Sequence, residues 1–284
     1  MITGVLGVLG ILTTWLTGVF TMDFWRNRKR IESKSTWLSS AGIGFITDFF
    51  DTLGIGSFAT STALMRAFDQ TEDRILPGTL NVAHALPTIL EAFIFMKVIE
   101  VEPLTLISML FSATIGAYFG ASFISKLDEK KIQLIVAIAL FASASLMIAG
   151  QLGLMPSGGE AIGLTGVKLI IAVVGNFVLG VLMTAGIGLY APCMALIFTL
   201  GLSPRVAFPI MMGSCAFLMP AAAVKFIKED AYDRRIAMGG TIAGIVGVVI
   251  AAYLVKSLPL NLLKWLVDAV IIYTAISLLK ESQS

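Results

Sequence analysis

Two acidic residues, Asp48 and Asp51, stand three positions apart in an apolar stretch and could carry a proton. Residues at this spacing share one face of a helix. Ionised carboxylates are costly within a membrane span and usually mark an ion or proton path. Two neighbouring carboxylates do not easily ionise together, so one of them can hold a proton. The pair therefore predicts proton coupling, with local capping or pairing as the purely structural alternative.

Two glycine pairs interrupt long apolar segments, at Gly54-Ile55-Gly56 and at Gly186-Ile187-Gly188. Glycine permits the φ > 0 turn of a chain that reverses direction. A helix that begins after such a break has N–H groups without intrahelical partners and a positive dipole end, so two facing ends can bind an anion. The alternative is that the glycines only allow close helix packing. The residues expected around the anion are Gly54, Gly56, Ser57 and Thr60 at the first break, and Gly186, Gly188, Leu189 and Cys193 at the second.

Asn81 and His84 form another polar pair with three-residue spacing in an apolar span. A buried polar group in lipid needs a partner or a water-lined cavity. We expect both side chains to hydrogen-bond the anion and His84 to relay a proton; the alternative is a helix-to-helix hydrogen bond. Their counterparts in the second half of the chain fall near Gly213 and Cys215. A single histidine cannot build a zinc site, and the sequence implies no metal and no cofactor.

The composition is that of an integral membrane protein. Of the 284 residues, 57% are hydrophobic and 13% are charged, and the mean hydropathy is +0.92. A soluble protein of this size cannot hide so much apolar surface. The composition therefore excludes a soluble enzyme, a disordered chain and a nucleic-acid binder, and leaves the lipid bilayer and a small solute as partners. The lack of alternating polar residues excludes an outer-membrane barrel.

Runs of about 20 apolar residues predict membrane-spanning helices. We expect an all-α integral membrane protein with seven full spans and two longer segments, Trp37–Phe68 and Gly166–Phe198, broken at the glycine pairs. In each broken segment the second arm is too short to cross a bilayer, which predicts a re-entrant hairpin. The predicted full spans are Ile2–Phe20, Ile75–Met96, Leu104–Ile124, Ile132–Leu152, Val206–Val224, Ile236–Val255 and Leu260–Leu279.

The two halves of the chain repeat one another at a shift of about 132 residues, from Gly54 to Gly186. Other matching positions, each within one residue of this register, are Pro77 with Pro209, Pro87 with Pro220, and Gly116 with Gly247. Each half has one hairpin and then three spans, and three is odd, so the halves are inverted in the membrane. Inverted repeats with broken helices are typical of secondary transporters. The predicted units are an N-terminal span with a basic loop (1–34), repeat one (35–152), an external linker (153–165) and repeat two (166–284).

The basic residues predict the orientation, because Lys and Arg accumulate on the cytoplasmic side. The hairpin arrangement places all of them inside except Lys97, Lys168, Arg205, Lys256 and Lys264. If each broken segment crossed the membrane once, the basic residues would be divided more evenly between the two sides. Two short full spans per hairpin would place them on the same sides as the re-entrant arrangement and stay an alternative. The prediction is a multi-pass plasma-membrane protein with its N-terminus outside and its C-terminus in the cytoplasm. A homodimer remains open.

The second glycine break and the sequence LGLSPRVA at 200–207 resemble the TauE/SafE family of membrane exporters. That family has a G-I-G-G-G stretch, a short apolar arm, then L-G-L-P-P-K-V-A and a G-T-S turn. Gly78-Thr79 and Gly213-Ser214 resemble the two G-T-S positions, so Gly213 and Ser214 are further expected substrate contacts. This chain departs from the pattern, since Ser57-Phe58 and Leu189-Tyr190 replace the consecutive glycines. The resemblance implies transport of an anionic sulfur compound such as sulfite or an organosulfonate.

Three functions compete at this point. The first is a secondary transporter of a small anion, with export and proton coupling. The second is a cation or small-ion channel or carrier built on Asp48 and Asp51. An enzyme is not expected, because a nucleophile with a base or a multidentate metal set is not visible in the sequence. Glu91 and Asp268 are expected near span ends, with Asp268 in a solvated pair with Lys264.

Overall fold

The computed structural model describes residues 2–29, 31, 34–96, 100–254 and 261–283, and their regular structure is helical. This confirms the all-α prediction. The helices run in the order α1 (Ile2–Asn27), α2 (Trp37–Thr52), α3 (Ser57–Ala67), η1 (Asp73–Ile75), α4 (Leu76–Ala83), α5 (Ala85–Phe95), α6 (Pro103–Ile124), α7 (Glu129–Gln151), α8 (Gly166–Met183), α9 (Tyr190–Thr199), α10 (Pro204–Lys228), α11 (Arg234–Leu254) and α12 (Asn261–Gln283).

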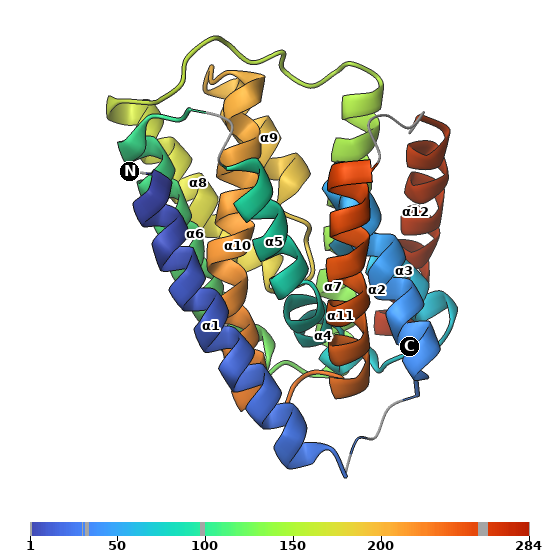
Figure 1. Cartoon of the computed structure of the whole chain (residues 1–284). Coiled ribbons are helices and arrows are strands. Elements are labelled where there is room, and N and C mark those ends of the chain that lie inside the picture. The colour runs from blue at the N-terminus through green and yellow to red at the C-terminus, as the bar shows by residue number, and fades with distance from the viewer. Residues whose placement is uncertain (1, 30, 32–33, 97–99, 255–260, 284) are drawn as a thin grey trace.

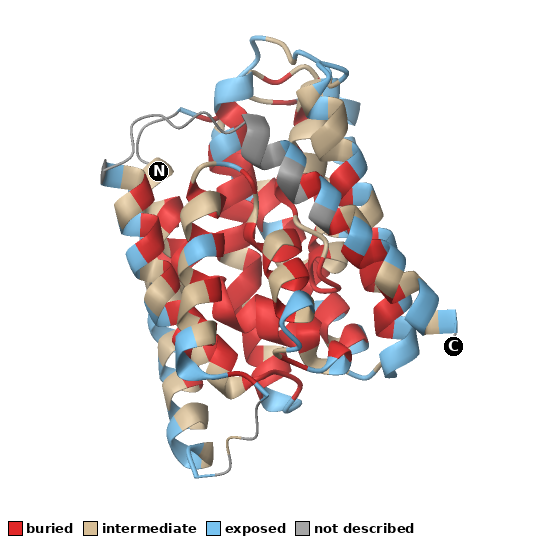
Figure 2. Ribbon diagram, turned by 90° about the vertical axis from the view of Figure 1, so that its right-hand side faces the viewer, coloured by how far each residue is buried: buried red, intermediate tan, exposed pale blue. Residues whose placement is uncertain are grey.

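Within the described residues, seven helical segments are long and apolar enough to cross a membrane. Six of them match predicted spans, and the seventh is α8, the first arm of the second broken segment. The predicted span Leu260–Leu279 is covered by α12 except for Leu260, which lies outside the described residues, as does Val255 at the end of another span. Buried positions gather in the middle of the bundle, while exposed and half-buried positions cover its outer faces (Figure 2).

Each broken segment folds back on itself as a hairpin. The end of α3 returns to the start of α2, where Lys34 Nζ lies 3.0 Å from Asp69 Oδ1. In the second hairpin, Lys168 Nζ near the start of α8 donates to the Leu200 carbonyl after α9 at 3.1 Å. Figure 1 shows the first hairpin entered from the lower end of the bundle, after α1, and the second from the upper end, across the loop that follows α7.

The two hairpins pack in the same way on the rest of the bundle. The first arm α2 packs along α11, and the first arm α8 packs along α6. A Cβ added at Gly247 of α11 would lie 2.5 Å from the Phe45 carbonyl oxygen of α2. A Cβ added at Gly116 of α6 would lie 2.1 Å from the Phe177 carbonyl oxygen of α8. These close approaches require glycine, and they relate the halves by the same shift that the sequence repeat has.

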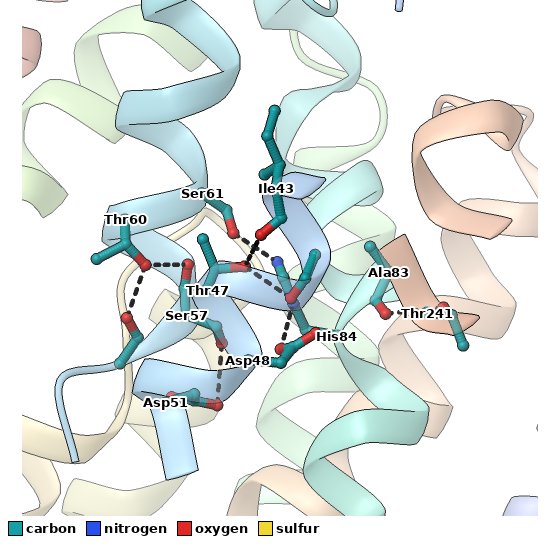
Figure 3. Close-up of polar contacts among 12 residues, drawn as sticks. Ile43, Thr47, Asp48, Asp51, Ser57, Thr60, Ser61, Ala83, His84 and Thr241 are labelled. Atoms are coloured by element: carbon teal, nitrogen blue, oxygen red, sulfur yellow. Dashed lines mark hydrogen bonds and ion pairs between the residues drawn. The ribbon is translucent and has the colours of Figure 1, made fainter. Parts of the chain in front are cut away.

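The predicted span Ile75–Met96 is divided into α4 and α5 at His84. Pro87 has no N–H, so the Ala83 carbonyl four residues earlier has no helical donor. Thr241 of α11 fills this place, because its hydroxyl donates to the Ala83 oxygen at 2.8 Å. The Ala83 carbonyl therefore has a donor despite the break, and the His84 side chain points toward the first hairpin (Figure 3).

Candidate functional site

One cavity of ≈ 470 Å³ lies between the tips of the two hairpins. Five of the expected substrate contacts line it: Gly54, Gly56 and Ser57 from the first break, and Gly188 and Leu189 from the second. Thr88 of α5, Ser143 and Gln151 of α7, and Cys215 of α10 complete parts of its wall. The structure thus brings together two breaks that are far apart in the sequence.

At the first tip, Gly54 and Gly56 have φ values of 88° and 93°, so the turn needs residues without a Cβ. The Ser57 hydroxyl, at the start of α3, donates to Asp51 Oδ2 at 3.1 Å, and the Ser57 backbone N–H also interacts with this carboxylate. Asp51 itself lines the cavity. The positive end of α3 is therefore already matched by an acidic side chain.

The second tip differs from the first in having no acid. Gly186 has the left-handed φ of this break, 102°, and packs near Leu80 and Val136, whereas Gly188 lines the cavity without a left-handed φ. Pro192 is the third residue of α9 and has no N–H, so Tyr190 and Ala191 supply the donors of its first turn. The start of α9 is the free positive helix end of the site.

Behind the first tip, His84 joins Asp48 to Ser61 (Figure 3). His84 Nδ1 lies 2.7 Å from Asp48 Oδ1, and His84 Nε2 lies 2.8 Å from Ser61 Oγ. All three side chains are fully buried. Asp48 Oδ2 has no hydrogen-bond partner and lies against Gly244 of α11, where a Cβ would come within 1.9 Å of it. Asp48 and His84 are thus next to the cavity wall but do not line it.

Other expected substrate contacts have protein partners. Thr60 donates to the Gly56 and Ser57 carbonyls at 2.9 Å, and Asn81 Nδ2 donates to the Pro77 carbonyl at 2.9 Å. The Asn81 Oδ1 atom is buried and has no partner. Neither Thr60 nor Asn81 is among the described residues that line the cavity.

The polar residues of the second half form a separate group that joins three helices. Asn176 of α8 donates to the Met109 carbonyl of α6 at 2.8 Å and to Ser214 Oγ of α10 at 2.9 Å. Cys193 Sγ lies 3.7 Å from Asn176 Oδ1, and Gly213 faces the side chains of Met96 and Leu110. The structure therefore places Cys193, Gly213 and Ser214 in helix packing beside the cavity, and a substrate contact by them stays a prediction.

Sequence reasoning missed Glu91 and Tyr190. Glu91 is fully buried at the cavity wall, although its position near the end of a predicted span suggested an interface location. Its carboxylate accepts a hydrogen bond from Tyr190 at 3.0 Å, and Tyr190 lines the cavity. The signal was available, since an acid in an apolar span marks function. Asp268 is also buried and bonds to Gln151, so its expected solvated position is wrong; the Lys264 side chain lies outside the described residues.

The charge of the cavity wall is unusual for an anion site. Among the described lining residues there is no Lys or Arg, and Asp51 is the ionisable carboxyl group. Any attraction for an anion must come from backbone dipoles, chiefly at the start of α9. Two helix breaks at one cavity, each from a different half of the bundle, are typical of secondary transporters.

The model of the family described as "Sulfite exporter TauE/SafE" matches residues 1–147 and 168–284. The chain belongs to the sulfite exporter TauE/SafE family. The match includes both hairpin tips and leaves out only the end of α7, the linker and the start of α8. Searches of curated proteins and of solved structures found no match. Membership in TauE/SafE makes the chain a multi-pass membrane transporter and, at the level of the family, not an enzyme.

Proposed function

We propose that this TauE/SafE protein is a secondary transporter that exports a small anionic sulfur compound across the plasma membrane. The single observation that carries the proposal is that both hairpin tips line one cavity. We further propose that the two hairpins are re-entrant, one from each face of the bilayer, with the N-terminus outside and the C-terminus in the cytoplasm. The two termini lie toward opposite ends of the bundle, which supports this orientation (Figure 1).

The anionic group of the substrate binds at the start of α9. The N–H groups of Tyr190 and Ala191 and the helix dipole supply the positive end, and Ser57 and Thr88 offer hydroxyls across the cavity. The start of α3 becomes available only when Asp51 gives up its bond to Ser57. The acid and the substrate therefore compete for one of the two helix ends.

The body of the substrate is apolar or polarisable. The cavity volume of ≈ 470 Å³ lies in the range of sites for organic ligands and far exceeds what a bare oxyanion fills. Its wall includes four methionines, whose flexible side chains adapt their shape to apolar groups. They are Met147, Met155, Met183 and Met194. These features support an organic sulfonate over inorganic sulfite.

Proton movement is coupled to transport through Asp51, with Asp48 and His84 as a relay. An ionised Asp51 repels the anion and holds Ser57, whereas a protonated Asp51 does neither. Proton and anion binding are then mutually favourable, and this coupling is reciprocal. The bond of 2.7 Å between His84 and Asp48, one helical turn from Asp51, supports the relay.

The competing function is a cation channel or carrier. It is favoured by the Asp51 carboxyl in the wall and by the lack of Lys and Arg among the described lining residues. Under this hypothesis the acids would bind the transported ion directly. Cations rather than sulfonates would then stabilise the protein.

The test is ligand binding by the purified protein, measured by thermal shift with sulfite, short and long alkyl sulfonates, carboxylates and monovalent cations. Calorimetry then measures the affinity of the best ligand between pH about 5 and about 8, the range in which a buried carboxyl group can change its protonation state. Binding of a sulfonate should weaken as the pH rises in the wild type. Asp51→Asn should keep binding and lose the pH dependence, while the exposed Asp69→Asn should behave as wild type. Stabilisation by cations alone, or equal slopes in wild type and Asp51→Asn, would contradict the proposal.

A further inference from the structure

One side chain, Glu91 of α5, touches both hairpins at their tips. Its Oε1 lies 2.7 Å from the Oγ1 of Thr52, the last residue of α2. Its Oε2 accepts a hydrogen bond of 3.0 Å from the hydroxyl of Tyr190, the first residue of α9. Glu91 is fully buried, and Thr52 and Tyr190 are buried as well. The tips of the two hairpins are thus joined through one carboxyl group on α5.

The short contacts of Thr52 support a proton on this carboxyl group. Thr52 Oγ1 lies 2.7 Å from Glu91 Oε1 and 2.9 Å from the Asp48 carbonyl oxygen. A hydroxyl has one proton to donate, and a carbonyl oxygen can only accept. Thr52 faces two acceptors with one proton, so both contacts can be full hydrogen bonds at the same time only if Glu91 Oε1 is protonated and donates to Thr52. Glu91 is then a neutral acid that donates through Oε1 and accepts from Tyr190 through Oε2.

Within the part of the chain that the structure describes, no Lys or Arg acts on Glu91 to balance a negative charge. The ionisable groups that act on it are acids or weak acids, apart from His84, which is bonded to Asp48. Helix α4 has no ionisable residue, and those of α1, α10 and α11 lie near the helix ends, except Cys215. The ionisable groups facing Glu91 from the packed elements are Asp48 and Asp51 on α2, His84 before α5, Tyr190 on α9 and Cys215 on α10.

We propose that Glu91 is a second proton-carrying residue and that its proton holds the two hairpin tips together. In the protonated state both bonds form, and the tips are closed over the cavity. When the proton leaves, the carboxylate becomes an uncompensated buried ion, and Thr52 must turn away from Asp48 to serve it. Such an ion is stable only with water around it. Opening of the contact between Glu91 and Tyr190 lets that water in, and it separates the second tip from the first.

We call the contact of Glu91 with Thr52 and Tyr190 the latch. This proposal adds to the transport function and rests on it only for the role of the latch in opening the cavity. Its tests therefore use the protein in detergent without substrate. If the latch behaves as expected but no sulfonate binds, the transport proposal fails and the latch stands. If sulfonates bind and the latch measurements fail, the reverse holds.

The first test is infrared spectroscopy of the protonated carboxyl groups. At pH about 7, where an unperturbed Glu is ionised, the wild type should show a protonated-carboxyl band. Glu91→Gln should remove the part of this band that Glu91 contributes, and the exposed Glu160→Gln should leave the band unchanged. Tyr190→Phe should shift the Glu91 part of the band, because the carbonyl oxygen loses its donor. A wild type without such a band, or a band of equal intensity in Glu91→Gln, would overturn the proposal. If Glu91→Gln does not fold, an unshifted band in Tyr190→Phe would overturn it instead.

The second test is the distance between spin labels placed at Leu53 and Ile187, on the two tips. The wild type should have one short distance at pH about 5, where Glu91 holds its proton, and a longer one at pH about 9, where the proton has left. Glu91→Gln reproduces the neutral acid, so its distance should stay short at both pH values. Tyr190→Phe should give the longer distance at both. An identical pH response in the wild type and in Glu91→Gln would refute the latch.

Discussion

Substitution of Gly244 by alanine should disrupt the hydrogen bond between Asp48 and His84, although Gly244 is not part of that bond. The new Cβ would lie 1.9 Å from Asp48 Oδ2, 2.9 Å from Asp48 Cγ and 3.0 Å from Pro87 Cγ. Asp48 must therefore move by roughly 1 Å, which is enough to lengthen a bond of 2.7 Å beyond hydrogen-bond range. The destabilisation is between about 1 kcal/mol, if Asp48 only bends aside, and about 6 kcal/mol, if the bond to His84 is also lost.

The assay is equilibrium or thermal unfolding in detergent, with Gly42→Ala as the matched control. Gly42 lies on the facing helix α2, and a Cβ there meets nothing within 4 Å. This control should be neutral or slightly stabilising, because alanine costs less backbone entropy in a helix. A Gly244→Ala protein with wild-type stability would refute the reasoning.

A rescue experiment follows from the repeat. At the matching positions of the repeat, Gly180 corresponds to Asp48 and Ala113 corresponds to Gly244, and Gly180 and Ala113 pack closely. Asp48→Gly combined with Gly244→Ala recreates that pair at the first hairpin. The double variant should be more stable than the sum of the single effects implies, since the residues are in contact. Additive losses would show that the clash is not the cause.

Three further outcomes are expected. Thr241→Val should lose about 1–3 kcal/mol of unfolding free energy, because it leaves the buried Ala83 carbonyl without a donor, and Thr241→Ser should match the wild type in the same unfolding assay. Gly56→Val should lower both the unfolding temperature and transport because of its left-handed φ, whereas Gly188→Val should narrow the cavity and weaken sulfonate binding at an unchanged unfolding temperature. Glu102 caps α6, and hydrogen bonds from the first turn lower the pKa of its carboxyl group. The cap should therefore stabilise the folded protein fully above the unfolded pKa of about 4.3, and this stabilisation should disappear as the pH falls through the lower folded pKa. In Glu102→Gln the unfolding temperature should fall less steeply with acid than in the wild type.

Much of the fold could be predicted from local patterns. Apolar runs located the spans to within a few residues, because a bilayer demands a fixed length of apolar helix. The glycine pair at 54–56 predicted a reversal, and the repeat matched it with 186–188. Which glycine takes the left-handed φ was less well predicted at the second break, where Gly186 and not Gly188 has it. Sequence spacing says that a turn occurs, but the surrounding packing selects the residue that makes it.

The candidate site was predictable only in part. Gly54, Gly56, Gly188 and the adjoining Ser57, Leu189 and Asp51 line the cavity, since they belong to or adjoin the tips that the repeat identified. Thr60 and Asn81 were indistinguishable from them in the sequence, because a polar residue near a break looks the same whether it faces a cavity or its own helix. Their hydroxyl and amide groups bond to nearby backbone carbonyls instead.

The sequence by itself determined the membrane class, the family resemblance, the two helix breaks and their repetition, since these depend on composition, length and spacing along the chain. The tertiary structure alone decided that Thr241 completes the break at His84, that Gly244 makes room for Asp48, and that Glu91 meets both hairpin tips. Each of these contacts joins residues from different helices. Hydrogen bonds and buried charges act over a few ångströms, so their partners are fixed only when the helices have packed.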